Sequence, residues 1–318
     1  MRQKRRNFMK DYSILFVLLA EIIIFSLMSS QFFTMGNLSN VLRQVSFTMI
    51  AALGEALVLL TAGMDLSIGA QITFVNVVTA YMMVKMGFSP MLAALLGIAL
   101  TTLIGFLIGF IITKTNIPPM IATLAMMGIL QGIAYIVSEG RSIYGFPKSF
   151  SVIGQGKIGG ILPIPVMIMV VCLILVWLLM NKTYVGRYFF AIGGNEKAAV
   201  LSGIHVNRYK SVVYTISGFF AGLAGILLLS RLSSGTPLTG DGYEIDIITA
   251  VVLGGVSISG GRARISNIVT GVLIIGVLEN GFVLVGVGEY PQMVVKGMIL
   301  LASVIFDCTQ RNKLDVSS

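Results

Sequence analysis

Long apolar runs separated by short polar segments make up almost the whole chain. A helix needs about 20 residues to cross a bilayer, and the runs are continuously apolar, whereas the strands of a membrane barrel alternate. In lipid the backbone must satisfy its own hydrogen bonds, so the runs are predicted to be helices. The ten predicted spans cover residues 12–31, 41–62, 66–85, 91–113, 119–138, 163–181, 209–231, 243–260, 265–285 and 291–307.

The composition indicates the same class. Of the 318 residues, 56% are hydrophobic and 11% are charged, and the mean hydropathy is +0.94. A soluble domain carries about 25% charged residues, and this chain has too few polar residues to build a soluble surface. The fold class is therefore predicted to be all-α: a polytopic membrane protein of about ten transmembrane helices, with residues 1–318 forming a single transmembrane domain.

The positive charges predict the orientation. An even number of spans places both termini on one side, and that side would hold fifteen Lys and Arg residues against six on the other, with Lys296 inside span ten. Because cytoplasmic loops carry the excess of Lys and Arg, both termini are predicted to be cytoplasmic. The net charge of +9 follows from this topology and requires no nucleic-acid partner. The first apolar run is too long for a typical secretory signal, which favours an uncleaved first span.

Residues 191–210 form a polar segment between two apolar runs. Asn195 is a residue type that caps helix N-termini, Glu196 suits the positive first turn, and Gly203 is suited to end a helix. A short helix from Asn195 to Gly203 is therefore predicted outside the bilayer, within a cytoplasmic segment 182–208. Such a helix on a chain that is otherwise embedded in the membrane indicates a docking point for a soluble partner.

Two glycine clusters interrupt the apolar runs, one between spans two and three and one at the end of span eight. Broken helices at membrane depth are tolerated only where they line protein or water. The similarity of the clusters, together with a proline opening spans five and ten, indicates two inverted halves of about 1–160 and 161–318. The residues expected at the helix breaks are Gly63, Asp65, Gly69, Gly254, Gly255, Gly260 and Gly261.

Other glycines recur at a spacing of four residues. Gly105-x3-Gly109 and Gly218-x3-Gly222 each place two glycines on one face of a predicted helix. Small residues at this spacing allow the backbones of two membrane helices to approach closely, so these faces are predicted to be packing surfaces.

Intramembrane carboxylates are candidate functional residues. Asp65 is expected to cap span three, and Glu55 and Glu279 lie deeper; Glu279 could face a polar cavity, contact a partner or snorkel to the interface. Residues Asp241, Glu244 and Asp246 are expected to form a solvated rim at the outer mouth of span eight. The sequence contains no catalytic constellation, no nucleotide-binding loop and no metal-ligand spacing, so enzymatic activity and a metal site are not predicted.

The order and spacing of short motifs give the chain a resemblance to the permease subunits of sugar ABC importers of the ribose type, nearly end to end. Two positions depart from the family pattern: Arg264 replaces a usual glycine, and Glu279 replaces a small or polar residue. The motifs are Asn37-Leu38, Leu42-Arg43-Gln44-Val45-Ser46, Gly63-Met64-Asp65-Leu66-Ser67-Ile68-Gly69, Pro118-Pro119, Thr123-Leu124, Met126-Met127, Gly140-Arg141, Ile143-Tyr144-Gly145, Gly193-Gly194-Asn195, Ala198-Ala199, Ser202-Gly203-Ile204, Gly240, Gly242-Tyr243-Glu244, Val251-Val252-Leu253-Gly254-Gly255 and Gly260-Gly261-Arg262.

This resemblance implies a type II importer fold, a homo- or heterodimer of permease subunits, a cytoplasmic ATPase and an extracytoplasmic sugar-binding protein. The chain would bind no cofactor itself, because ATP and Mg²⁺ belong to the ATPase. The polar segment would supply the ATPase-coupling residues, and small side chains there would allow close seating in the partner's groove. These residues are Gly193, Gly194, Asn195, Glu196, Ala198, Ala199, Ser202 and Gly203.

In the same fold class the fifth span of each half lines the central passage. The side chains expected to line it share one helical face of span five, at a spacing of three to five residues. They are Thr123, Met126, Met127 and Gln131.

Two alternatives stay open at this point. A permease for branched-chain amino acids or nucleosides would carry motifs of the same style. An ion-coupled secondary transporter would need no ATPase and would use membrane carboxylates such as Asp65 or Glu279.

Overall fold

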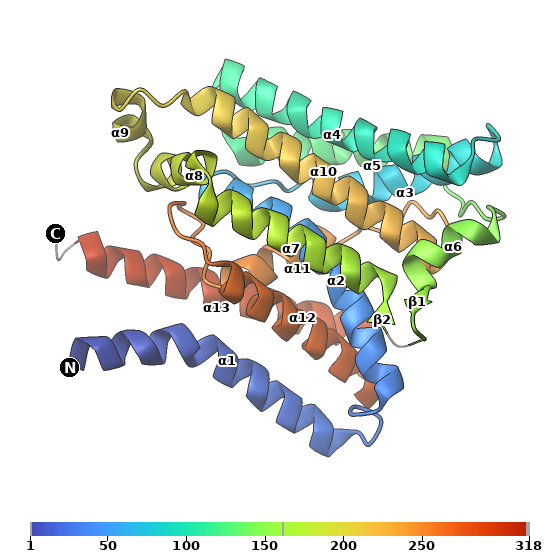
Figure 1. The fold of residues 1–318 in the computed structure, drawn as a ribbon, viewed down its shortest axis with the longest axis horizontal. Coiled ribbons are helices and arrows are strands. Elements are labelled where there is room, and N and C mark those ends of the chain that lie inside the picture. The colour runs from blue at the N-terminus through green and yellow to red at the C-terminus, as the bar shows by residue number, and fades with distance from the viewer. Residues whose placement is uncertain (1, 161, 316–318) are drawn as a thin grey trace.

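A computed structural model describes residues 2–160 and 162–315, with side chains placed for 14–160 and 162–309. Nearly all of it is helical, and the long helices run roughly along one axis (Figure 1). Seven helices of the described residues are long and apolar enough to cross a membrane. They are α2 (Met35–Leu60), α4 (Pro90–Thr115), α5 (Pro119–Ser138), α7 (Ile164–Lys182), α10 (Val206–Leu232), α12 (Ile265–Val285) and α13 (Glu289–Asp315).

Shorter elements complete the fold. The helix α1 (Arg2–Met28) has an apolar part at Ile14–Met28, and α3 (Ile68–Val84) is apolar along its length. Two strands form a small antiparallel hairpin, β1 (Lys157–Ile158) and β2 (Leu162–Pro163). The remaining helices are α6 (Lys148–Gln155), α8 (Tyr184–Gly194), α9 (Glu196–Leu201) and α11 (Tyr243–Leu253). The chain is thus a polytopic, all-α membrane protein.

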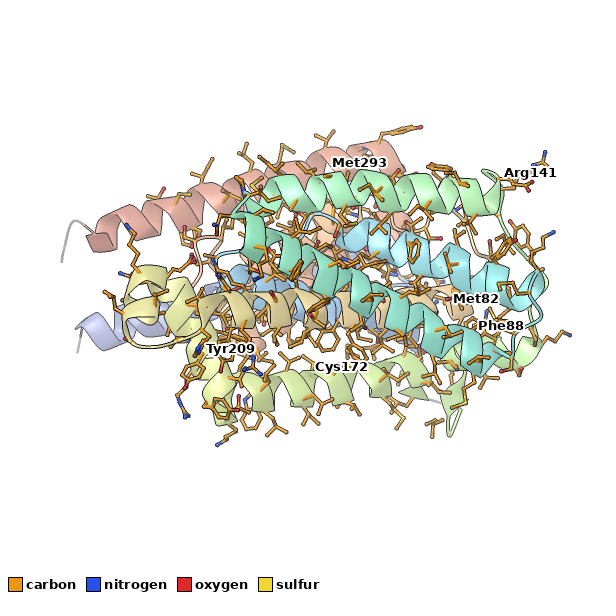
Figure 2. The ribbon with its side chains drawn as sticks, turned by 90° about the horizontal axis from the view of Figure 1, so that it is seen from above. Met82, Phe88, Arg141, Cys172, Tyr209 and Met293 are labelled. Atoms are coloured by element: carbon orange, nitrogen blue, oxygen red, sulfur yellow. The ribbon has the colours of Figure 1, made fainter. Side chains whose placement is uncertain are left out.

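The two ends of the chain lie at the same end of the molecule, together with α8 and α9 (Figure 1). The hairpin and α6 lie at the opposite end. The view from above shows the same separation, with Phe88 and Arg141 at one end and Tyr209 at the other, while Cys172 lies midway along α7 (Figure 2). This arrangement agrees with an even number of crossings.

The helices α2, α3 and α10 form the centre of the fold. Most of α2 and α10 is buried, whereas α5 and α13 are largely exposed at the periphery. The helices α4 and α10 pack through the predicted glycine faces: a Cβ built on Gly218 would lie 3.1 Å from the Cα of Gly105, and one on Gly109 would lie 2.7 Å from the Cα of Ser211. The prediction of close backbone approach at these glycines is confirmed.

The predicted span 243–260 is wrong as a membrane-spanning helix. The helix α11 ends at Leu253 after 11 residues, which at 1.5 Å per residue is about half of the ~30 Å hydrocarbon thickness. The residues that follow it, 254–264, form a loop, and those before it, 233–242, are largely non-helical. Glycines allow both departures, because Gly242, Gly255, Gly260 and Gly261 all have positive φ.

The non-helical segment 233–242 runs along α3. The backbone of Gly235 pairs with that of Ile143 in an isolated antiparallel bridge. The amide of Thr236 donates to Asn76 Oδ1 at 3.1 Å, and the amide of Gly240 donates to Thr73 Oγ1 at 2.9 Å. The chain therefore returns into the helical bundle as a non-helical segment, with turns from Pro237 to Gly242, followed by the half-length α11.

Candidate functional site

Segment 182–208, between α7 and α10, contains two helices, α8 and α9, at the end of the molecule where α1 begins and α13 ends (Figure 1). The predicted start of α9 is confirmed, because Asn195 Oδ1 accepts a hydrogen bond from the amide of Ala198 at 3.0 Å. Gly203, with φ of 82°, follows its end as predicted. The preceding helix α8 was not predicted.

Several of the predicted coupling residues make contacts within their own subunit. Glu196 forms an ion pair with Lys210 at 2.7 Å, and Ser202 Oγ donates to the carbonyl of Ala198 at 2.9 Å. Gly194 and Ala198 are exposed, whereas a Cβ on Gly193 would overlap the carbonyl oxygen of Leu60.

Ala199 differs from the expectation that it seats in a partner's groove. Its side chain is only 3% exposed and packs with Ile192 of α8 and Val206 of α10. Direct contact of Ala199 with a partner stays a prediction, and it would require α9 to separate from the subunit. The outward face of α9 instead carries Val200 and Leu201, whose exposed fractions are 56% and 89%. An exposed leucine on a short helix at the end of a membrane protein is a candidate contact for a soluble partner.

The break between α2 and α3 is organised by Asp65, which is fully buried. Its Oδ1 accepts from the amide of Ser67 at 3.0 Å, so it stabilises the turn that leads into α3. The predicted cap at Asp65 is wrong, because Ser67 occupies the N-cap position of α3 and no side chain caps this helix. Asp65 Oδ2 accepts from Ser217 Oγ of α10 at 3.1 Å and Gln71 Nε2 at 3.3 Å. The buried Glu55 joins the cluster, because its Oε1 accepts from the amide of Asp65 at 3.3 Å.

The glycines of this break allow close contacts. A Cβ on Gly63 would lie 2.6 Å from the hydroxyl of Tyr214, and a Cβ on Gly69 would overlap the carboxylate of Glu244. The second predicted break lies in the loop after α11. Gly254 caps α11, and Gly255, Gly260 and Gly261 follow in that loop.

The predicted solvated rim is wrong for Glu244 and Asp246, whereas Asp241 is exposed as predicted. Glu244 lies over Gly69 in the first turn of α3, and Asp246 Oδ2 accepts from Lys296 Nζ at 2.8 Å with both side chains mostly buried. The error has a physical cause. The segment 233–242 enters the bundle alongside α3, so α11 starts inside the bundle and not at its mouth.

Lys296 of α13 also forms an ion pair with Glu279 of α12, so three helices share one cluster of charges. Gln44 of α2 donates to Glu279 Oε2 at 2.8 Å. Asn280, the residue after Glu279, exchanges reciprocal amide hydrogen bonds with Asn37 of α2 at 2.8 and 2.9 Å. Glu279 therefore lies in an internal ion-pair network, which is none of the three roles left open for it.

The four side chains predicted to line the passage share one face of α5, and that face is directed at α3 and segment 233–242. Thr123 is fully buried and donates to the carbonyl of Met64 at 3.3 Å, and Gln131 Nε2 donates to the carbonyl of Pro237 at 2.8 Å. Met126 and Met127 pack near Phe74 of α3. A role in lining the passage stays a prediction, which requires the passage to open between α5 and α3.

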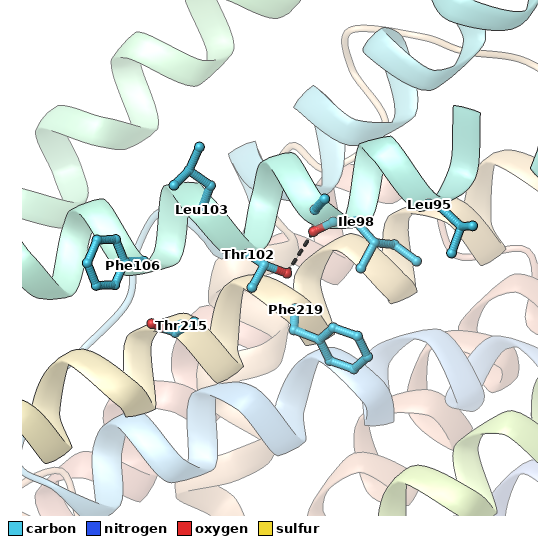
Figure 3. Close-up of a pocket in the computed structure, with 8 residues that line it drawn as sticks. Leu95, Ile98, Thr102, Leu103, Phe106, Thr215 and Phe219 are labelled. Atoms are coloured by element: carbon cyan, nitrogen blue, oxygen red, sulfur yellow. Dashed lines mark hydrogen bonds between the residues drawn. The ribbon is translucent and has the colours of Figure 1, made fainter. Parts of the chain in front are cut away.

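A groove of about 710 Å³ lies on the outer surface of α4 and α10 (Figure 3). Its two threonines use their hydroxyl protons within their own helices: Thr102 donates to the carbonyl of Ile98 and Thr215 to that of Ser211. Such a surface suits hydrocarbon and lacks the polar groups that recognise a sugar. The lining residues are Leu95, Ile98, Ala99, Thr102, Leu103, Phe106, Thr215 and Phe219.

Comparison with known proteins identifies the family. Residues 37–304 match the family model described as "Branched-chain amino acid transport system / permease component". The chain belongs to this family of permeases. It is 43% identical to the ribose import permease of Bacillus subtilis (strain 168) over 288 residues, which cover 90% of this chain and 89% of that protein.

Further relatives are named for ribose and for L-arabinose. It is 42% identical over 310 residues to the ribose import permease of Escherichia coli (strain K12), with 95% of this chain and 96% of that protein covered. It is 40% identical over 297 residues to the L-arabinose transport system permease of the same strain, with 93% and 90% covered. No solved structure matches the chain. The resemblance to ribose-type permeases is confirmed, and the permease is a transport subunit, not an enzyme.

Sequence reasoning missed the role of Lys296. The signal that could have revealed it was present, because a lysine inside span ten needs an opposite charge and Glu279 lies in the preceding span. The second partner, Asp246, could not be found in this way while it was assigned to a solvated rim.

We predict that the Lys296 cluster stabilises the permease by direct pairing. Lys296→Met leaves two mostly buried carboxylates without their cation and should lower the free energy of unfolding by about 3 kcal/mol. Glu279→Gln alone should also destabilise the permease. The loss of unfolding free energy in the double variant Lys296→Met, Glu279→Gln should be smaller than the sum of the two single losses by more than about 1 kcal/mol. Denaturant unfolding of the purified permease measures these values.

The exposed Glu139 at the end of α5 supplies the matched control. The pair Lys296→Met and Glu139→Gln should be additive within about 0.5 kcal/mol. If the effects of Lys296→Met and Glu279→Gln also added within about 0.5 kcal/mol, the pairing would be contradicted.

Proposed function

We propose that this chain is the membrane-spanning permease subunit of an ATP-binding-cassette importer that translocates a pentose, a hexose or a related polyol-like solute. The observation that carries the proposal is the end-to-end similarity to permeases named for ribose and L-arabinose, at 40–43% identity. A permease named for D-allose is 36% identical over 94% of the chain.

The partners follow from this assignment. A cytoplasmic ATPase would bind ATP and Mg²⁺ and supply the energy, an extracytoplasmic binding protein would deliver the sugar, and a second permease subunit would complete the passage. The chain itself would hold no cofactor. It would sit in the cytoplasmic membrane with both termini in the cytoplasm, since the excess of Lys and Arg lies on that side.

Ten crossings in two inverted halves agree with the order of elements when segment 233–242 and the half-length α11 together make the eighth crossing. The first half would comprise α1 to α5, and the second would comprise α7 and α10 to α13. In each half a long second helix is followed by a non-helical segment and a shorter third helix: 61–67 precedes α3, and 233–242 precedes α11. Both fifth helices have proline in their first turn, at Pro119 and Pro291. The equivalent of the first break would then be 233–242, not 254–261.

Segment 182–208 would couple transport to ATP hydrolysis. The exposed Leu201 and Val200 of α9 would enter a groove of the ATPase, and closure of the ATPase pair would push α8 and α9. The push would shift the permease between outward and inward access. Binding of sugar within the passage would be weak, because tight binding slows release.

One observation favours a second candidate. The family model is described for branched-chain amino acid transport, so amino acids are the alternative substrate class.

An ion-coupled transporter is a different alternative. It would use the fully buried carboxylates Glu55 and Asp65.

We predict ATP-driven sugar uptake in proteoliposomes that contain the permease together with its ATPase and its sugar-binding protein. In vesicles whose ATPase faces the lumen, labelled ribose and arabinose should accumulate in the lumen. Accumulation should require both ATP in the lumen and binding protein outside the vesicle. Accumulation of leucine in their place would support the amino acid alternative. Uptake driven by an ion gradient without ATP would contradict the importer assignment.

We predict that Leu201 contacts the ATPase. Leu201→Asp should abolish co-purification of the ATPase while leaving the melting temperature of the permease within about 2 °C, because an exposed side chain contributes little to stability. Met35→Asp is the matched control. Met35 is 84% exposed and begins α2, at the end of the molecule opposite α9. Retention of the ATPase by Leu201→Asp would contradict the contact.

We predict the orientation from the positions of two exposed residues. Ser149 lies in α6 and Asn181 lies in the last turn of α7, at opposite ends of the molecule. In a Cys308→Ser background, an impermeant thiol reagent on intact cells should label Ser149→Cys and not Asn181→Cys. The reverse pattern would place the termini outside.

A further inference from the structure

Three backbone segments meet at the cytoplasmic end of α2 with no side chain between them. The first is Leu60 at the end of α2, the second is Gly193 near the end of α8, and the third is Gly260 and Gly261 in the loop after α11. The amide of Gly261 donates to the carbonyl of Leu60 at 2.9 Å. A Cβ on Gly193 would overlap both that carbonyl and the Gly261 amide, and a Cβ on Gly260 would lie 2.9 Å from the Gly193 Cα.

The contact is rigid because it is made by main-chain atoms. Side-chain contacts can absorb a displacement by changing rotamer, whereas packed backbone atoms have no such freedom, so a shift of one segment must shift the others. Gly260 and Gly261 have φ of 83° and 76°, a conformation that other residues adopt only at a cost.

The loop is also attached to α13. Asp307 Oδ2 accepts from Ser257 Oγ at 3.0 Å and from the amide of Ile258 at 3.3 Å. One glycine-rich loop therefore links α8, the end of α2 and α13, and it continues directly from α11.

On the other side of the contact, α8 moves with α9. Ile192, the neighbour of Gly193, is buried together with Ala199 of α9 and Val206 of α10. A displacement of α9 is thereby carried to Gly193. From Leu60 the chain leads within five residues to Asp65, whose carboxylate holds the break between α2 and α3.

We propose that Gly193, seated on the Leu60 carbonyl and Gly261, is the transmission contact through which movement of α9 reaches α2, α11 and α13. Gly193 is a positioning residue for transport: it touches its own subunit and not the ATPase. This inference rests on the proposed function, because it needs an ATPase that acts on α9.

The test compares two single methyl groups. Gly193→Ala should leave binding of the ATPase unchanged but lower sugar uptake and the stimulation of ATP hydrolysis by loaded binding protein about tenfold, because coupling and not assembly is disturbed. Gly36→Ala is the matched control: Gly36 lies at the other end of α2 and has no atom within 4 Å of an added Cβ. It should keep both rates within about twofold of the unmodified permease.

A second variant covers the case in which Gly193→Ala fails to assemble in the membrane. Asp307→Ala adds no bulk, releases the loop from α13, and should lower the same stimulation ratio with the ATPase still bound. Wild-type stimulation in Gly193→Ala, or in Asp307→Ala where the first variant does not assemble, would overturn the transmission contact. If loaded binding protein did not stimulate ATP hydrolysis in the unmodified complex, the proposed function would be overturned instead.

Discussion

The need to satisfy backbone hydrogen bonds away from water governs this structure. A continuous helix meets the need by itself, but residues 61–67 and 233–242 leave helical geometry inside the bundle and must find partners elsewhere. Asp65 accepts from the amide of Ser67 in the first segment. Side chains of α3 serve the second, because Thr73 and Asn76 accept from the amides of Gly240 and Thr236.

This requirement explains why α3 is apolar on average and yet contains buried polar residues. Gln71, Thr73 and Asn76 are fully buried, and each is bonded to one of the two non-helical segments or to the residue that organises it. The helix α3 therefore binds the break that precedes it to the break that precedes α11. Loss of the Thr73 or Asn76 side chain would leave a backbone amide of segment 233–242 unsatisfied, at about 1–3 kcal/mol.

The two clusters of carboxylates are stabilised by different means. Asp65 accepts hydrogen bonds from neutral donors, Ser67, Gln71 and Ser217, which come from three parts of the chain. Asp246 and Glu279 share the cation of Lys296. The first solution fixes a local turn with short side chains. The second joins α11, α12 and α13 through one long side chain, which can follow small shifts between helices.

The apolar runs predicted most of the helices, because lipid requires a continuous apolar surface from every segment that crosses it. The predictions failed where the partner is distant in sequence. Segment 233–242 is held by Asn76, 160 residues earlier, so nothing within it shows that it returns into the bundle. Asp246 was assigned to a solvated rim for the same reason, because its partner Lys296 lies 50 residues later in the sequence. For Ala199, a small residue indicated close packing correctly, but the sequence could not show that the neighbours are Ile192 and Val206 of the same subunit.

The polar contacts also show which parts of the permease are joined as units. The helix α13 is peripheral, yet it has two polar anchors on α11 and its loop: Lys296, which also pairs with Glu279 of α12, binds Asp246, and Asp307 binds the loop after α11. The helix α11 is itself bounded by non-helical residues at both ends, 233–242 and 254–264. A short helix between two non-helical segments can tilt without bending, and its anchors require α13 to follow. Because the loop after α11 also contacts Gly193, the unit formed by α11 and α13 receives its displacement from the same end of the molecule that presents Leu201.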